Sequence, residues 1–390
     1  MFKSWPQRLV PWVLFALPAL AFGPREALTY RPPELGLLAA RAGLAAARAD
    51  YARLGLSGTA GATVQDELTA TLGLRLNLSE TARLAAESDR QKTEARLRQA
   101  LRDGVYRALK AHAGLWRAEA EAKAARARLK AARLRLEAAE KRDGPLARAT
   151  AKNGLEDAEL GLELAELDLK AAAQEAKALG LKGPAEPGTL RFALPVPRPD
   201  PSQALAVRTA KARAGAAERG LFTLRLALAY QGDLGYRLEA ESQTPSLALT
   251  LGPKNPLAPP GTWKAELSAR LALDPVAWNR AKDAALAARE TALAAARQGG
   301  EREMQLKTLR SRALLLEKRL ALAKKALALA EKRLEAARLR HERGLVSALD
   351  LANEAAARYE AEARLAQAWG AYLDAVKAYL DLADGEWRER

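Results

Sequence analysis

The side chains that carry most protein chemistry are scarce in this sequence. It has 390 residues, no cysteine and two histidines, His112 and His341, which lie far apart in the chain. The lack of cysteine excludes thiol nucleophiles, disulfides and cysteine-based zinc sites. No Gly-rich phosphate loop, metal-ligand cluster or paired-carboxylate motif stands out. We therefore expect no enzyme, no cofactor and no metal site, and we expect both histidines to be surface residues.

The composition is typical of long helices. Ala, Leu, Arg, Glu and Lys dominate, and aromatic residues make up 5%. The formal net charge of +16 could suit nucleic acid or anionic lipid. The basic residues, however, alternate with Glu and Ala at helical spacing, as in the stretch 123–128. This pattern favours solvated helix faces over a nucleic-acid surface.

Residues 1–21 have the features of a signal peptide for export. Two basic residues precede an apolar stretch, 9–20, which is too short to span a membrane as a helix. Ala19 and Ala21 form a small-x-small cleavage site, so the mature chain is expected to begin at Phe22. An uncleaved anchor helix is the alternative. No later segment is apolar enough for a transmembrane helix, so we expect any membrane crossing to use β-structure.

The mature chain divides into two halves with the same order of elements. In each half an Ala-rich helix leads to strand-like sequence, then to a very long helix that ends at a glycine, then to a return helix. Proline-rich sequence at 194–201 separates the halves and predicts an extended connector around the waist of the helical body. The expected divisions are a signal peptide, a first repeat, a linker, a second repeat and a tail: 1–21, 22–188, 189–201, 202–385 and 386–390.

Helix lengths predict how the elements fit together. Residues 80–142 would form a helix about 95 Å long, and residues 274–343 a similar one with Gly299 and Gly300 as a potential kink. The return helices reach roughly half as far, and the Ala-rich helices could continue them. One long helix would then lie beside two short ones stacked end to end. The shorter helices are expected at 34–54, 147–179, 202–220 and 347–383.

Alternating sequence predicts strands before each long helix. Residues 68–78 and 263–273 alternate apolar and other residues over about the length of a tilted membrane strand. Partner strands are expected near 54–65 and 222–230, with a first turn at Gln65, Asp66 and Glu67. Residues 231–262 predict either a loop or an additional hairpin on the outer side. An ordinary half-buried strand of a soluble sheet fits the alternation equally well.

One apolar and one polar face per strand suit a membrane barrel. Four strands cannot close a barrel, and lipid does not tolerate an open edge, so several chains would have to pool their strands. The lipid-facing positions would be Leu72, Leu74, Leu76, Leu267 and Leu271. The lumen-facing positions would be Arg75, Arg225 and Arg270. Four aromatic residues could form girdles at the membrane interfaces, although placement by chance explains them equally well: Trp263, Trp278, Phe222 and Tyr236.

The order of elements resembles the TolC family of outer-membrane efflux proteins over nearly all of the mature chain. The most specific part is the stretch 343–351, which contains the Gly-Leu-Val-Ser-x-x-Asp turn found at the periplasmic tip in that family. Gly344 can take a positive φ and end one helix, and Ser347 can cap the next, with Asp350 three residues on. The first tip, 143–148, keeps the glycine but lacks the Leu-Val-Ser run. The Pro-Leu-Phe-type segment after the barrel strands is also missing.

The resemblance implies a fold and a function. The fold is mainly α with a small β part: two structural repeats of long antiparallel helical hairpins plus β-hairpins, forming a trimeric α-barrel with a 12-stranded transmembrane β-barrel. The function is an outer-membrane channel subunit of a tripartite efflux or type I secretion system, with the helical body in the periplasm. The implied partners are two sister subunits, a periplasmic adaptor protein, an inner-membrane pump and outer-membrane lipid, but no nucleic acid.

The resemblance also implies two sites at the tip. Asp350 matches a position whose carboxylates narrow the periplasmic entrance, although capping of its helix explains it equally well. Asn353 stands where some relatives have a second acid. The adaptor-docking residues would be Gly344, Leu345, Val346, Ser347 and Gly144. Two alternatives remain open: a soluble periplasmic coiled-coil or adaptor protein, and a basic nucleic-acid-binding coiled coil.

Overall fold

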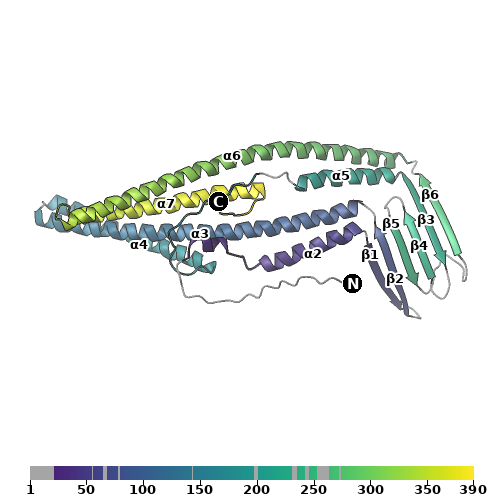
Figure 1. Ribbon diagram of the computed structural model, residues 1–390, viewed down its shortest axis with the longest axis horizontal. Helices are drawn as coiled ribbons and strands as arrows, with labels where there is room; N and C mark the ends of the chain where they lie inside the picture. The colour runs from purple at the N-terminus through teal and green to yellow at the C-terminus, as the bar shows by residue number, and fades with distance from the viewer. Residues whose placement is uncertain are drawn as a thin grey trace.

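The protein is an elongated helical body with a β-sheet at one end (Figure 1). The computed structural model describes residues 22–54, 56–64, 68–77, 80–142, 144–196, 201–230, 235–241, 246–252, 263–271 and 274–390. The predicted mainly α fold with a small β part is confirmed. The proposed signal peptide and the turn at 65–67 lie outside the described residues.

Four long helices form a layer that runs from the waist to the far tip. The helices α3 (Glu80–Arg142) and α6 (Pro275–Glu342) are followed by the return helices α4 (Pro145–Ala178) and α7 (Ala348–Ala383). Because α3 packs against α4 and α7, and α7 packs against α6, the order across the layer is α4–α3–α7–α6. The predicted helical hairpins are therefore confirmed. α6 continues as one helix through Gly299 and Gly300.

Shorter helices complete the body on the side of the sheet. α2 (Leu35–Leu54) packs against α3, and α5 (Pro201–Arg219) packs against α6 (Figure 1). Each long helix thus lies beside two shorter ones, as predicted. The sequence pattern did not predict the five-residue helix α1 (Pro24–Leu28), which also packs on α3.

The core lies at the waist, where α7 crosses α3. Trp369, Tyr372 and Tyr379 of α7 are at most 1% exposed. Phe192, from the predicted linker, stacks on the Trp369 ring with the centroids 5.9 Å apart, and Tyr372 Oη accepts a hydrogen bond of 3.0 Å from the Phe192 amide. Phe192 also pairs through its backbone with Glu389 in the C-terminal tail. The described part of the linker is therefore held between the core and the tail.

His112 corrects the prediction that both histidines lie on the surface. Its side chain is 0% exposed, and its ring makes an edge contact with Phe22 at 5.6 Å. His112 Nε2 donates a hydrogen bond of 2.9 Å to the Glu186 carbonyl oxygen, and burial lowers the pKa of the imidazole. The surface prediction failed because α3 is covered at this level by Phe22 and by the segment after α4. His341 is half-buried in the last turn of α6.

The sheet has six strands in the described residues. Their order is β1-β2-β5-β4-β3-β6, and each neighbouring pair is antiparallel. β4 and β5 come from the 231–262 region and lie between β2 and β3, not on the outer side of the sheet. A 12-stranded trimer requires four strands per chain, so this count differs from the prediction. The strands are β1 (Leu56–Val64), β2 (Leu68–Asn77), β3 (Phe222–Tyr230), β4 (Gly235–Glu241), β5 (Ser246–Gly252) and β6 (Trp263–Leu271).

Candidate functional site

The second tip turn, residues 343–347, joins α6 to α7 and is held by several hydrogen bonds. Gly344 has φ of +72°, a left-handed conformation that favours glycine. The Gly344 amide donates to the His341 carbonyl and the Leu345 amide donates to the Arg340 carbonyl, both at 2.9 Å. These two bonds form a Schellman motif, which satisfies the last carbonyl groups of α6. His341 Nδ1 donates a further hydrogen bond of 2.8 Å to the Val346 carbonyl oxygen, which ties the end of the turn to the last turn of α6.

Ser347 and Asp350 begin α7 as a reciprocal cap. Ser347 Oγ accepts a hydrogen bond of 3.1 Å from the Asp350 amide and donates one of 2.6 Å to Asp350 Oδ2. An N-terminal serine with an acidic residue three positions on is a favourable start for a helix. The Asp350 side chain is exposed.

Asn353 lies one turn further along α7, where it contacts α3. Its side-chain oxygen accepts a hydrogen bond of 3.3 Å from Arg135 of α3, and its side chain is half-buried. The structure therefore places Asp350 and Asn353 on successive turns at the start of α7. In one copy of the chain, Asn353 links two helices while Asp350 remains exposed.

The first tip turn is built differently. Gly144 has φ of −72° and ψ of 174°, with no side-chain cap on α4. Pro145 follows it, and a residue before proline favours extended backbone, so this glycine is not a left-handed helix stop as Gly344 is. Leu146 is 81% exposed at this turn and Leu345 is 72% exposed at the other. The two turns lie at the same end of the molecule (Figure 1).

The sheet places its apolar positions on one face. Pairing aligns Leu226 with Leu267 and Phe222 with Leu271. Leu267 is 68% exposed and Leu271 is 56% exposed, whereas Arg225 lies on the opposite face of β3. The register also puts the positions of Leu72, Leu74 and Leu76 on the apolar face, and those of Arg75 and Arg270 on the other. The predicted two-faced assignment thus follows the strand register across the sheet.

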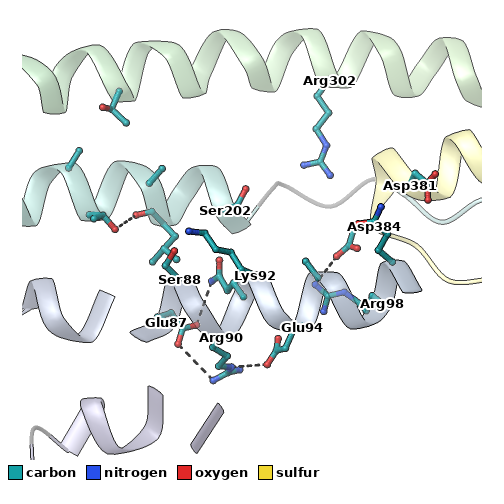
Figure 2. A pocket seen from close by; sticks show the side chains of 18 of the residues that line it. Glu87, Ser88, Arg90, Lys92, Glu94, Arg98, Ser202, Arg302, Asp381 and Asp384 are labelled. Carbon is teal, nitrogen blue, oxygen red and sulfur yellow. Dashed lines mark hydrogen bonds and ion pairs between the residues drawn. The ribbon is translucent and has the colours of Figure 1, made fainter. Parts of the chain in front are cut away.

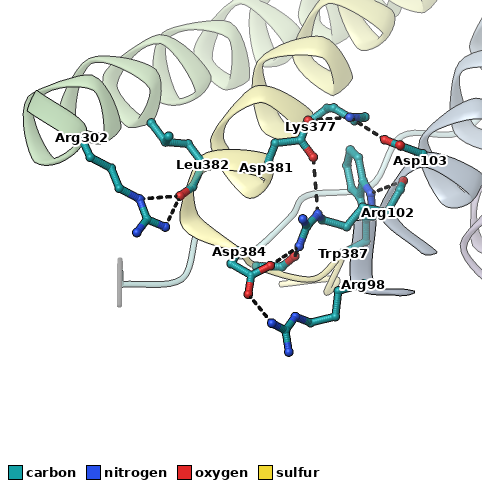
Figure 3. A network of polar contacts seen from close by, with 10 residues as sticks. Arg98, Arg102, Asp103, Arg302, Lys377, Asp381, Leu382, Asp384 and Trp387 are labelled. Carbon is teal, nitrogen blue, oxygen red and sulfur yellow. Dashed lines mark hydrogen bonds and ion pairs between the residues drawn. The ribbon is translucent and has the colours of Figure 1, made fainter. Parts of the chain in front are cut away.

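A network of polar contacts joins the end of α7 to α3 (Figure 3). Asp384 has φ of +50° just past the helix end, and its two oxygens accept ion pairs from Arg98 at 2.9 Å and Arg102 at 2.8 Å. The Arg102 side chain is 8% exposed and also pairs with Asp381. Arg302 of α6 donates two hydrogen bonds to the carbonyl oxygen of Leu382. The last carbonyl groups of a helix have no partner within the helix, so such bonds stabilise its end. Three helices are therefore fixed together at one level of the waist.

No protein-family model and no curated protein matches the sequence. The fold, in contrast, matches solved structures over most of their length. The CmeC outer membrane channel of Campylobacter jejuni has a TM-score of 0.57 at 15% identity, covering 94% of this chain and 85% of that one. The outer membrane protein VceC of Vibrio cholerae has a TM-score of 0.56 at 17% identity, covering 94% and 96%. The outer-membrane channel OprN has a TM-score of 0.55 at 17% identity, covering 93% and 89%.

The chain has the fold of the TolC-family outer-membrane channels. The resemblance to that family, based on the order of elements and on the turn at 343–351, is thereby confirmed. At 15–17% identity the likeness rests on the order, length and packing of the elements rather than on shared side chains. Among the described helices, none has a stretch apolar and long enough to cross a membrane.

In this TolC fold, the sheet side of the waist carries a charged cavity of about 840 Å³ (Figure 2). It lies between α3, α5, α6 and the end of α7, and ion pairs such as Arg90–Glu94 at 2.9 Å line it. Basic side chains outnumber acidic ones, and no group of three metal-ligating side chains occurs in the part of the chain that the structure describes. The charged lining is Arg90, Lys92, Arg98, Arg102, Arg213, Arg302, Glu87, Glu94, Asp381 and Asp384.

The sequence did not predict the polar network between the end of α7 and α3. The signal was available as acidic residues at 381 and 384 near the end of a helix and basic residues at 98 and 102. Their pairing depends on how far α7 slides along α3, and the helical periodicity of either helix does not fix that offset.

Proposed function

We propose that the chain is one subunit of a homotrimeric channel in the outer membrane, a passive conduit from the periplasm to the exterior. One observation carries the proposal: both layers of the chain end in open edges. The helix layer ends at α4 and α6, and the sheet ends at β1 and β6. A single copy is therefore an arc of a wall, and copies of the same arc can close it into a cylinder.

The edges of the helix layer have the pattern of a coiled-coil seam. On α6, Leu315, Leu322 and Leu329 recur every seven residues and are 54%, 64% and 52% exposed. On α4, Leu160 and Leu167 have the same spacing and are both 59% exposed. Leucines at heptad spacing pack into a neighbouring helix, which buries apolar surface worth about 25 cal/mol per Å². We infer that α6 of one copy packs against α4 of the next.

The edges of the sheet give the second reason for closure. β1 and β6 are the outermost strands, so each has a row of backbone groups without a strand partner in the same copy. In lipid an unsatisfied backbone group costs roughly several kcal/mol, which is why membrane sheets close. Pairing of β6 with β1 of the next copy satisfies both edges and places the exposed Leu267 and Leu271 against lipid. The arginine positions 75, 225 and 270 then face the lumen.

The far tips would form the periplasmic end of the conduit. Three copies of Asp350 around the axis would give a ring that attracts cations, with Asn353 adding polarity but no charge. The turn residues Gly344, Leu345, Val346 and Ser347 would contact a periplasmic adaptor, and Gly144 would do so from the first tip. An inner-membrane pump would supply the energy, as in tripartite efflux or type I secretion.

Fractionation and sizing test this function. The chain expressed with its signal should enter the outer-membrane fraction and elute in detergent as a trimer that forms ion-conducting pores in planar bilayers. Leu322→Glu should abolish the trimer by placing a charge in the seam. Leu345→Glu is the matched control, because it places the same charge on a similarly exposed leucine at the tip, and the trimer should persist. A chain that is stable without detergent as a monomer would support a soluble coiled-coil protein instead.

A further inference from the structure

We propose that each subunit contributes six strands to the barrel, so that three subunits close an 18-stranded cylinder and not a 12-stranded one. This proposal rests on the proposed function, since it requires three copies in a membrane. It adds a specific claim about β4 and β5: they are part of the barrel wall, neither an external loop nor a plug.

The strand pairing is the first reason to place β4 and β5 in the barrel wall. β5 pairs with β2 from Leu72↔Leu251 to Asn77↔Ser246, and Asn77 is the last residue of β2. β4 pairs with β3 from Tyr230↔Tyr236 to Arg225↔Glu241. The hairpin thus separates β2 from β3 and reaches the end of the sheet that lies next to the helices.

The register of the strands also supports placing β4 and β5 in the barrel wall. One row of paired positions across the sheet is Leu74, Leu249, Leu238 and Leu228. The next row, on the opposite face, is Gly73, Thr250, Arg237, Ala229 and Lys264. A shift of one residue would reverse the two faces of the hairpin. Its alternation instead continues the apolar and polar faces of its neighbours, as a wall between lipid and water requires.

The strand directions also permit closure. Each neighbouring pair in β1-β2-β5-β4-β3-β6 is antiparallel, so β1 and β6 run in opposite directions. β6 can therefore pair with β1 of the next copy in the same antiparallel manner. Because barrel diameter grows about linearly with strand number, the cylinder should be about 1.5 times as wide as a 12-stranded one.

Engineered cysteine pairs test the strand order directly, because the chain has no cysteine of its own. The pair Gly73→Cys with Thr250→Cys joins β2 to β5, positions that are aligned only if the hairpin is in the wall. The pair Gly73→Cys with Ala229→Cys joins β2 to β3. These positions share a row but lie three strand spacings apart in the proposed wall, about 14 Å, which is beyond the reach of a disulfide. Ala229→Cys with Lys264→Cys joins β3 to β6 and should bond in either arrangement.

The readout is the loss of free thiols in oxidised outer membranes, with trimer content measured on the same samples. We expect the 73–250 pair to lose most of its thiols, as the 229–264 control does, while the 73–229 pair stays near its reduced level. Bonding of the 73–229 pair, or failure of the 73–250 pair in trimers where the control bonds, would overturn the 18-stranded wall. Absence of trimers or of membrane insertion would instead refute the proposed function.

Discussion

The two return helices, α4 and α7, occupy matching places in the two halves but differ in what surrounds them. α7 buries Trp369, Tyr372 and Tyr379 almost completely. On α4 the buried residue among those described is Ala176, while Leu160 and Leu164 are 59% and 64% exposed. The repeat therefore preserves topology but not burial: α7 holds the subunit together, and α4 presents an apolar edge to a neighbour.

The tip turns differ in the same direction. The turn before α7 combines a left-handed glycine, a Schellman motif and a serine cap, whereas the turn before α4 has an extended glycine followed by proline. The polar network at the waist also ends on α7. The caps at the tips are thus concentrated in the second half of the chain, and the waist network joins that half to α3 in the first.

The largest effect should come from the α7 core. Trp369→Ala removes a ring that is 0% exposed, and it should lower the free energy of unfolding by about 3–5 kcal/mol. Leu164→Ala on α4 should change it by less than about 0.5 kcal/mol in the isolated subunit. Chemical denaturation followed by far-UV circular dichroism checks both. Equal losses would show that the return helices are equivalent after all.

The waist network should give the next largest effect. Asp384→Asn keeps a side chain that tolerates positive φ but removes the charge facing Arg98 and the nearly buried Arg102. We expect a loss of about 1–3 kcal/mol in unfolding free energy, with Asp381 limiting the damage. The control, Glu389→Gln, breaks an ion pair with the exposed Arg25 and should leave the melting curve unchanged. A comparable loss in both variants would contradict the role given to the network.

The two tip glycines should respond unequally. Adding a Cβ meets no atom within 4 Å at either Gly344 or Gly144, so backbone conformation alone decides the outcome. Gly344→Ala should cost about 1–2 kcal/mol because its φ is positive, and Gly144→Ala should cost close to nothing. Hydrogen exchange at the Leu345 amide reports the local opening. Faster exchange in the Gly144 variant than in the Gly344 variant would reverse the comparison.

The smallest effect concerns pH and the buried His112. Its pKa in the folded chain lies below the ordinary value of 6.5, so between these two values the unfolded chain binds the extra proton. Stability should therefore fall as the pH drops below about 6.5 and level off below the folded pKa. Burial raises the pKa of nearby Glu119, which acts in the opposite direction, so His112→Gln is compared with the parent at each pH. Melting temperatures at pH 7.5 and 5.5 should differ less in the variant; an equal decrease would exclude His112.

Much of the fold was predictable because the signals are local and long. Periodicity predicted α3 as residues 80–142, the bounds that the structure gives, and the chemistry of Gly344 and Ser347 predicted the second turn. His112 was misplaced because burial depends on what packs against α3, and that includes a segment more than 70 residues away. The sequence did not decide between a loop and a hairpin at 231–262, because the alternation there is weak and proline-rich sequence follows it at 253–261. Strand order in turn depends on long-range pairing. The network around Asp384 could not be predicted, because its pairing depends on the offset between α7 and α3, which periodicity does not fix.

Native mass spectrometry of the particle extracted from outer membranes in detergent tests the central claim most directly, because it counts the copies that close the wall. The account predicts three copies of the processed chain in one complex, and dissociation of that complex by Leu322→Glu but not by Leu345→Glu. A processed chain recovered as a single copy from plain buffer, with α4 and α6 stable in water, would contradict it.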